Sequence, residues 1–390
     1  MTKTRITPSA GLIWVFLVLG LVTAFMAIFA AMLMTEVGQL LDWPRQWLIT
    51  YYEHRWVYIG INLILLAVMW VLNARYALMH RYLMGLATVG VFLCIFAANF
   101  LLPTMFPSSQ TTAEYVSIEE ADKFMKPDDV IYAVEINGDV RGFPRHHLEI
   151  PHIAGDTIGG EDVTMTFCAL SNLPVVIDQS SNGEKMDLAI LIQVHNNLLM
   201  KDSNSGELIQ QITGEKEFSG GKVTEYPNDM MSWETFKTVY PEATVFEYQF
   251  NRPVDTFLQN LFEGPLEQHF DEAEPPIFPT VDLKDTRLPH KEQVWGLNVN
   301  DRQFAITKEF VEQNPFFAFE LDGQPFLLYY DEDLDVVTLF DRRIDGETVD
   351  VTEVDFFGNT PAGQLSKVPM QNGVFWMVWS HWFPNTGILG

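Results

Sequence analysis

The stretch IYAVEINGDVRGFPR, residues 131–145, has a counterpart 163 positions later in VWGLNVNDRQFAITK, residues 294–308. Asn137 then aligns with Asn300, and most positions before it pair apolar or small residues with each other. The same spacing, without a gap, aligns GEDVTMTFC (160–168) with GQPFLLYYD (323–331) and PVVID (174–178) with VTLFD (337–341). Ordered matches at one constant spacing indicate an internal repeat.

Further matches follow at a slightly smaller spacing. KVTEYP (222–227) aligns with QLSKVP (364–369), and Trp233 aligns with Trp376. We therefore expect two degenerate repeat units, residues 129–247 and 292–390. The segment between them, 248–291, is rich in proline and acidic residues and is predicted to be a linker.

Within each unit the pattern favours strands. Val163, Met165 and Phe167 alternate with Thr164, Thr166 and Cys168, which is the period of a half-buried strand. Short apolar runs end at clusters of Asn, Gly, Asp and Ser, as hairpins do. SWETFKTVY (232–240) predicts a short helix with Ser232 as its N-cap. The expected fold is mainly β, with short helices.

Residues 1–102 differ from the rest in composition. They hold three apolar runs, at about 11–34, 56–72 and 83–102, and each is close to the ~20 residues that a helix needs to cross a bilayer. The first run has no charge over 24 residues and is too long for a secretory signal. The sequence therefore predicts a transmembrane anchor over 1–102, followed by a juxtamembrane segment over 103–128.

Charge predicts the orientation of this anchor. Lys3 and Arg5 precede the first run, Arg75 and Arg81 lie between the second and third, and neither segment contains an acid. Positive segments stay in the cytoplasm, so three crossings carry residues 103–390 to the other side. Those residues hold 48 of the 51 acidic side chains and 18 of the 24 basic ones. This balance argues against a nucleic-acid partner and leaves the lipid bilayer as the predicted one.

Several ordered blocks resemble a known family. VEINGDVRGFP (134–144), PHIAGDTIGG (151–160), TFCALSN (166–172), NNLLMKDSNSGELIQQITGE (196–215) and FWMVWSHWFPNT (375–386) are similar to the bacterial and archaeal proteins grouped as domain of unknown function 3179, over roughly 115–389. The resemblance implies an uncharacterised activity. With the orientation predicted from charge, we expect the anchor in a bacterial inner or plasma membrane and residues 103–390 in the periplasm or the medium.

The resemblance also draws attention to three residues. His152, Asp156 and Cys168 occupy places where the family has a His, an Asp and the Cys of a Cys-Pro-Leu turn. This chain departs from that pattern with Gly155 for Asn and Ala169 for Pro. Because Ser171 replaces a second Cys, the pattern disfavours a two-cysteine redox or metal pair.

The repeat gives an independent reason to examine Cys168. Only one other cysteine exists, Cys94 in the third apolar run, so Cys168 lacks an evident disulfide partner in a compartment predicted to be oxidising. At the 163-residue spacing Cys168 corresponds to Asp331, His152 to Pro315 and Asp156 to Phe319. The first unit is thus polar and nucleophilic where the second is apolar or merely acidic.

Three functions remain open, and with them whether the chain is an enzyme. The first is a soft-metal site for copper or zinc, with Cys168, His152, His195 and His147 as ligands. The second is thiol catalysis, with Cys168 as nucleophile, His152 as base and Asp156 orienting the imidazole. The third is a non-catalytic binding or structural module in which Cys168 is buried.

Overall fold

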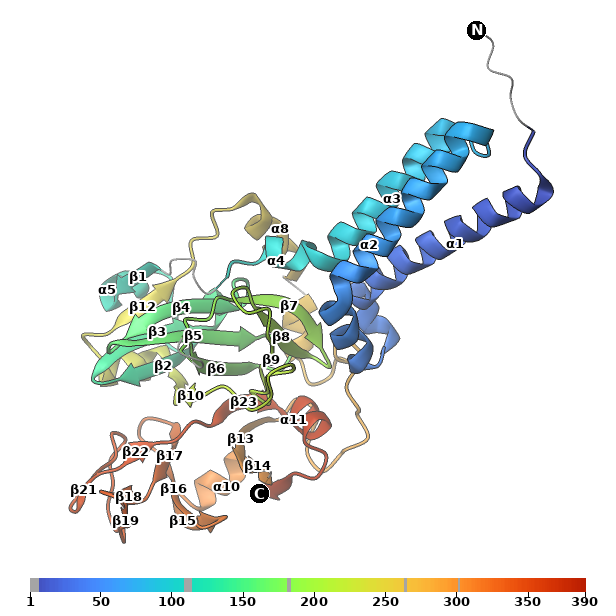
Figure 1. Ribbon diagram of the computed structural model, residues 1–390. Helices are drawn as coiled ribbons and strands as arrows, with labels where there is room; N and C mark the ends of the chain where they lie inside the picture. The colour runs from blue at the N-terminus through green and yellow to red at the C-terminus, as the bar shows by residue number, and fades with distance from the viewer. Residues whose placement is uncertain (1–6, 109–113, 181–183, 263–264, 301) are drawn as a thin grey trace. The chain divides into compact units, whose positions relative to one another are not determined.

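A computed structural model describes residues 7–390 apart from 109–113, 181–183, 263–264 and 301. Lys3 and Arg5, which contribute to the predicted orientation, lie outside the described residues. The chain divides into two compact units, one of residues 1–104 with Leu191–Val194, and the other of residues 105–190 with 195–390. Figure 1 shows the long helices of the first unit and the sheets of the second.

The first unit contains three helices that are long and apolar enough to span a membrane, α1 (Ala10–Leu33), α2 (Arg45–Tyr76) and α3 (Arg81–Asn99). Helix α2 begins at Arg45, before the apolar run predicted at about 56–72, because the aromatic segment in front of that run is also helical. Between α1 and α2 lies the 3₁₀ helix η1 (Glu36–Leu41), and α3 is followed by α4 (Leu101–Met105). Most large apolar side chains of these helices are exposed, as a lipid-facing surface requires.

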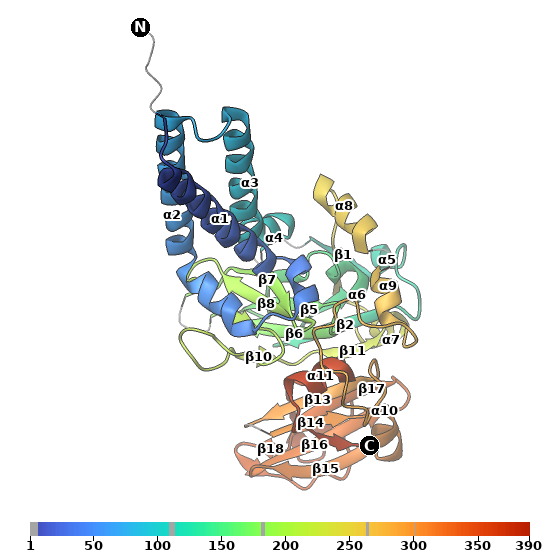
Figure 2. The same ribbon diagram turned by 90° about the vertical axis from the view of Figure 1, so that its right-hand side faces the viewer.

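The second unit is mainly β. Its five sheets of three to five strands form a propeller-like arrangement, and Figure 2 shows these sheets from a second direction. In the order of their pairing the strands are β1 (Glu114–Ser117), β12 (Thr244–Glu247), β3 (Asp139–Pro144), β2 (Val130–Ile136) and β11 (Asp229–Ser232); β10 (Glu225–Tyr226), β6 (Leu173–Asp178), β5 (Glu161–Cys168) and β4 (Ile153–Ile158); β7 (Leu188–Val194), β8 (Asn197–Asp202) and β9 (Leu208–Gln210); β23 (Gln371–Phe375), β13 (Gln293–Val299), β14 (Arg302–Ile306) and β24 (Gly387–Leu389); and β15 (Phe316–Leu321), β16 (Gln324–Asp331), β17 (Val336–Asp341) and β22 (Ser366–Lys367).

Short helices and two small hairpins complete this unit. The helices are α5 (Ile118–Ala121), α6 (Arg145–Leu148), α7 (Trp233–Val239), α8 (Pro253–Phe262), α9 (Pro265–Phe270), α10 (Lys308–Gln313) and α11 (Trp376–Trp382). The hairpins are β18 (Arg343–Ile344) with β19 (Glu347–Thr348), and β20 (Asn359–Thr360) with β21 (Gly363–Gln364). Ser232 accepts a hydrogen bond from the Thr235 backbone N–H, as expected for the N-cap of α7. The segment predicted as a linker carries α8 and α9.

The same succession of elements occurs on both sides of that segment. Strands β2 and β3 form a hairpin at Asn137, and β13 and β14 form one at Asn300, where both asparagines have positive φ. One further strand pairs in parallel with the second strand of each hairpin, β12 with β3 and β24 with β14. Three antiparallel strands follow in each case, β4–β5–β6 and β15–β16–β17. We call residues 114–247 the first half and residues 293–389 the second half.

The two halves differ in the segment that connects β6 to β10 in the first half and β17 to β22 in the second. In the first half, the three-stranded sheet β7–β8–β9 lies between β6 and β10 in the chain. In the second half, the two small hairpins occupy the corresponding place between β17 and β22. Trp233 and Trp376, which begin α7 and α11, are both fully buried. The shared core is therefore similar, while the inserted segment differs.

Candidate functional site

Cys168 lies at the end of β5 and is fully buried. Successive side chains of a strand point to opposite faces, so Cys168 shares a face with Thr164 and Thr166. Its Sγ donates a hydrogen bond to the backbone oxygen of Asn196, 3.6 Å away. The thiol therefore faces the loop between β7 and β8.

Thr166, on the same face, begins a chain of buried hydrogen bonds. The Gln211 side-chain amide donates to Thr166 Oγ1 at 2.9 Å and to the Leu173 backbone oxygen at 3.1 Å. Asn197 Nδ2 donates to Gln211 Oε1 at 3.1 Å and to Ser171 Oγ at 3.3 Å. Gln210 Nε2 donates to Asn197 Oδ1 at 2.7 Å. We refer to these side chains, together with Cys168, as the amide network: Thr166, Cys168, Ser171, Asn197, Gln210 and Gln211.

The amide network adjoins the second half through β23. The Ser171 backbone oxygen accepts a bond from the Phe375 N–H, and Asn172 Nδ2 donates to the Gly373 oxygen at 2.7 Å. Gln371 Nε2 donates to the Ile212 oxygen at 2.6 Å. Because buried polar groups cost free energy unless they are bonded, these contacts fix the two halves to each other.

His152 lies in a different environment. It precedes β4 and is opposite Phe167, the residue before Cys168. Because successive side chains of a strand alternate, the Phe167 side chain points away from the face that carries the thiol. The His152 ring stacks on Phe106, with centroids 5.1 Å apart, and its Nδ1 is buried with no hydrogen-bond partner among the described residues. Burial lowers the pKa of His152 to about 4, so the imidazole is neutral near pH 7.

Asp156, the predicted third member of a triad, pairs with Arg141, whose Nε is 3.3 Å from Asp156 Oδ2. It lies four residues beyond His152 along β4, which corresponds to about 13 Å in an extended strand. The structure therefore does not bring Asp156 to the His152 imidazole.

The other two predicted metal ligands make contacts of their own. His147 Nδ1 accepts a hydrogen bond from the Tyr248 N–H at 2.9 Å, and burial lowers the pKa of His147 to about 4. His195 Nδ1 lies 2.7 Å from the Thr280 oxygen, and its ring is 4.6 Å from that of His381. No group of three or more His, Cys, Asp or Glu side chains suited to a metal occurs among the described residues.

Comparison with known proteins adds one finding. The model of the family described as Protein of unknown function (DUF3179) matches residues 104–386. The chain belongs to this family. No curated protein and no solved structure matches the chain.

Two of the segments that resemble the DUF3179 family also build the amide network. Residues 166–172 contribute Thr166, Cys168 and Ser171, and residues 196–215 contribute Asn197 with the Gln210–Gln211 pair. Sequence reasoning selected Cys168 but missed the amides. The sequence did contain a signal for them, the doublets Asn196–Asn197 and Gln210–Gln211 beside apolar runs. Polar residues next to apolar strands are often buried and then need hydrogen-bond partners.

A polar cavity of about 240 Å³ lies between the two halves, beside the amide network. We refer to it as the inter-half cavity. The first half lines it with Thr213, Lys222, Val223 and Glu225, and the second half with Gly296, Asn298, Val299, Val368, Pro369, Met370 and Gln371. Gln371 also bonds the oxygen of Ile212, the residue that follows Gln211 of the amide network.

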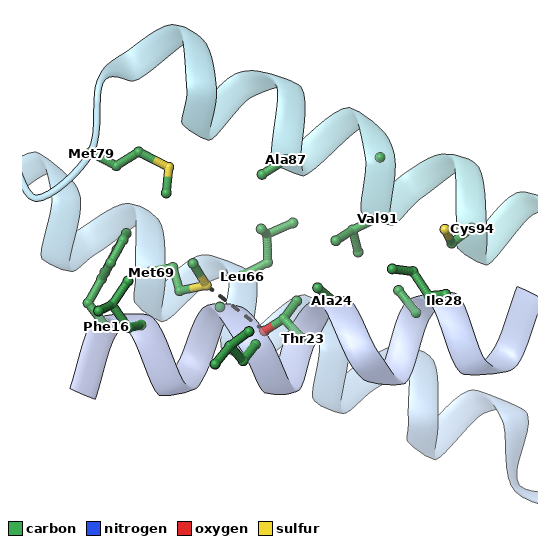
Figure 3. A pocket seen from close by; sticks show the side chains of 15 residues that line it. Phe16, Thr23, Ala24, Ile28, Leu66, Met69, Met79, Ala87, Val91 and Cys94 are labelled. Atoms are coloured by element: carbon green, nitrogen blue, oxygen red, sulfur yellow. Dashed lines mark hydrogen bonds between the residues drawn. The ribbon is translucent and has the colours of Figure 1, made fainter. Parts of the chain in front are cut away.

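A second cavity, of about 390 Å³, lies among the three long helices (Figure 3). Its lining is apolar apart from a few groups, such as the Thr23 hydroxyl, which bonds the Leu19 oxygen and the Met69 sulfur. Such a surface suits hydrocarbon but supplies no acid, base or cation. Of the two cavities, only the inter-half cavity combines a carboxyl group, an ammonium group and amides.

Proposed function

We propose that the chain is a membrane-anchored binding module whose β domain lies outside the cytoplasm, with Cys168 as a structural thiol. The observation that carries the proposal is the set of contacts made by Cys168. Its S–H donates to the Asn196 backbone carbonyl, whereas a catalytic cysteine reacts as a thiolate, which cannot donate. His152 and Asp156, the partners that a triad requires, have Phe106 and Arg141 as neighbours instead.

We further infer that the two halves are copies of one unit. The support is their common order of elements and the spacing of 163 residues, which takes β2 to β13, β5 to β16 and β6 to β17. Under this proposal the amide network is a feature of the first copy alone. The β7–β8–β9 sheet, which brings Asn197, Gln210 and Gln211, is absent from the described part of the second copy.

The orientation is part of the proposal. Arg75 and Arg81 flank the link between α2 and α3, and the acidic residues are concentrated after residue 102. Both features favour a cytoplasmic N-terminus and an exported β domain. A reporter fused at the C-terminus tests this: an enzyme active only outside the cytoplasm supports export, and one active only inside contradicts it.

Metal analysis of the purified full chain tests the role of Cys168. For a structural thiol, copper and zinc stay well below one ion per chain in the wild type and in Cys168→Ser. The free energy of unfolding falls by about 1 kcal/mol in the variant, since one buried hydrogen bond is weakened. One bound ion per chain, lost in Cys168→Ser, would refute the proposal.

That refuting result would favour a second candidate function, soft-metal binding. The observation in its favour is the buried Nδ1 of His152, which has no partner among the described residues although buried polar atoms are usually bonded. Cys168, His152, His195 and His147 are the ligands to test. Loss of the ion in His152→Ala as well as in Cys168→Ser, with retention in His147→Ala and His195→Ala, would assign the site to Cys168 and His152.

A further inference from the structure

Two opposite charges line the inter-half cavity without pairing. Glu225, the first residue of β10, is half-buried, and its carboxylate makes no hydrogen bond or ion pair with the described residues. Lys222, on the loop before β10, is exposed and makes no ion pair with Glu225. Glu225 Oε1 lies close to Gly214, at 3.2 Å from the place that a side-chain carbon would take there. Opposite charges that share a cavity but do not touch leave room for a ligand between them.

The remaining lining offers polar groups and apolar surface together. Gln371 is almost fully buried, and its Nε2 donates to the Ile212 oxygen at 2.6 Å, so its amide is held in place in the cavity wall. Asn298 Oδ1 accepts from Gln303 Nε2, which leaves the Asn298 amide hydrogens for another partner. Val223, Val299 and Met370 supply an apolar wall.

We propose that the inter-half cavity binds a small zwitterion of the α-amino acid class with an aliphatic side chain. In this arrangement the ligand's ammonium group pairs with Glu225, its carboxylate pairs with Lys222, and its side chain contacts the apolar wall. The inference rests on the proposed binding function and adds the class of ligand.

Size and charge both fit this class. Drug-sized ligands occupy cavities of about 300–1,000 Å³, so about 240 Å³ suits a smaller molecule. A simple amine would leave Lys222 unpaired, and a simple carboxylate would leave Glu225 unpaired. The unpaired carboxylate of half-buried Glu225 costs free energy, and the exposed Lys222 ammonium offers an additional contact, which makes a ligand that carries both charges the better match.

The protonation of Glu225 makes binding depend on pH. Burial raises the pKa of Glu225 to about 7, and the Lys222 ammonium opposes that shift. The neighbours of Glu225 on β6, Val176 and Ile177, are uncharged, as are Asn298 and residues 368–371 on the other side of the cavity. An ammonium group requires the ionised carboxylate, so the affinity increases as the pH rises from 6 to 8.

Isothermal titration calorimetry of the full chain in detergent, at pH 8, tests the proposal. The probes are leucine, leucinol (which lacks the carboxylate) and 4-methylpentanoate (which lacks the ammonium). We expect leucine to bind at least about tenfold more tightly than either analogue, because each analogue loses one charge-assisted contact. Glu225→Gln and Lys222→Gln each weaken leucine binding by about tenfold or more, and the exposed control Glu242→Gln leaves it unchanged.

Other results would overturn the inference, and they separate its failure from that of the proposed function. Equal affinity for leucine and leucinol, or unchanged leucine binding in Glu225→Gln, would reject the zwitterion while a binding module stands. No heat with any probe at millimolar concentration, from a protein whose circular dichroism shows it folded, would reject the ligand class. Stoichiometric metal lost in Cys168→Ser would instead reject the proposed function.

Discussion

Strands β5 and β16 occupy equivalent places in the two halves, but the faces that they present differ. β5 carries Thr164, Thr166 and Cys168 on one face, and the last two belong to the amide network. β16 carries Leu327, Tyr329 and Asp331 at the positions 163 residues later. Leu327 belongs to an apolar cluster with Phe340, Val351, Val354 and Leu365, and Tyr329 packs against it. One pattern of strand pairing thus accommodates a polar face in one half and an apolar face in the other.

This difference indicates what the fold requires. Replacing bonded polar groups by apolar ones of similar shape can be nearly neutral, so an apolar cluster would serve the first half as well as it serves the second. Asp331, at the position of Cys168, accepts bonds from the Asp333 and Leu334 N–H groups and so closes a turn. The polar residues of the first half are therefore not demanded by the strand arrangement, which supports a functional role for that half.

The largest expected effect is the loss of stability in acid, which originates in the first half and the segment after it. Burial lowers the pKa of His147, His152 and His269 to about 4. Below about pH 6.5 these histidines bind protons in the unfolded chain but stay neutral in the folded chain. The stability present at pH 7 is therefore lost as the pH falls toward 4. Each histidine costs up to ~2 kcal/mol at pH 5.

Glu225 acts in the opposite direction. Because its pKa is raised to about 7, the folded state binds a proton more readily than the unfolded state between about pH 4.5 and 7. We expect a net loss of about 4 kcal/mol between pH 7 and 5, measured by urea unfolding at each pH. His152→Phe should reduce the loss of unfolding free energy between pH 7 and 5, and Glu225→Gln should increase it. A free energy of unfolding that is flat over this range would contradict the burial of neutral imidazoles.

A second prediction concerns the coupling of the two halves. Lys367 Nζ lies 2.7 Å from Asp229 Oδ2, both side chains are mostly buried, and Thr338 donates to Asp229 Oδ1. Lys367→Met leaves a buried carboxylate without its cation and should destabilise the protein by about 3 kcal/mol. Asp229→Asn combined with Lys367→Met should cost less than Lys367→Met alone. Two separate unfolding transitions in the wild type would show that the halves are not one cooperative unit.

A third prediction compares the two faces directly. Gln211→Leu removes the amide that bonds Thr166, Leu173 and Asn197, and should cost about 2 kcal/mol because those partners stay buried. Its matched variant in the second half, Tyr329→Phe, removes a half-buried hydroxyl bonded to Asp331 and should cost under about 1 kcal/mol. Equal losses in the two variants, measured by urea unfolding, would remove the distinction between the faces.

The sequence predicted the features that depend on local pattern. The three apolar helices and the Ser232 N-cap follow from runs and spacings, and the hairpin at Asn137 has its counterpart at Asn300. The alternation of β5 placed Thr166 and Cys168 on one face. It did not indicate which segment covers that face, because the Asn and Gln partners come from β7–β9, whose position depends on packing distant in sequence.

The predicted site illustrates the same limit. His152 and Cys168 lie close in the pairing of β4 with β5, but the register places His152 opposite Phe167 instead of the thiol. Asp156 was expected to orient His152, yet it pairs with Arg141 on β3, a strand of another sheet. Neither the register of β4 with β5 nor a partner from another sheet can be read from spacing alone.

The most direct test of the structural thiol is the rate at which iodoacetamide labels Cys168, measured in a Cys94→Ser background. A buried S–H that donates to the Asn196 oxygen reacts only when the protein unfolds. We predict labelling in the native state at a rate that follows global unfolding across a urea series, and rapid labelling once the chain is unfolded. Labelling of the native protein as fast as that of the unfolded chain, and independent of urea, would contradict the account.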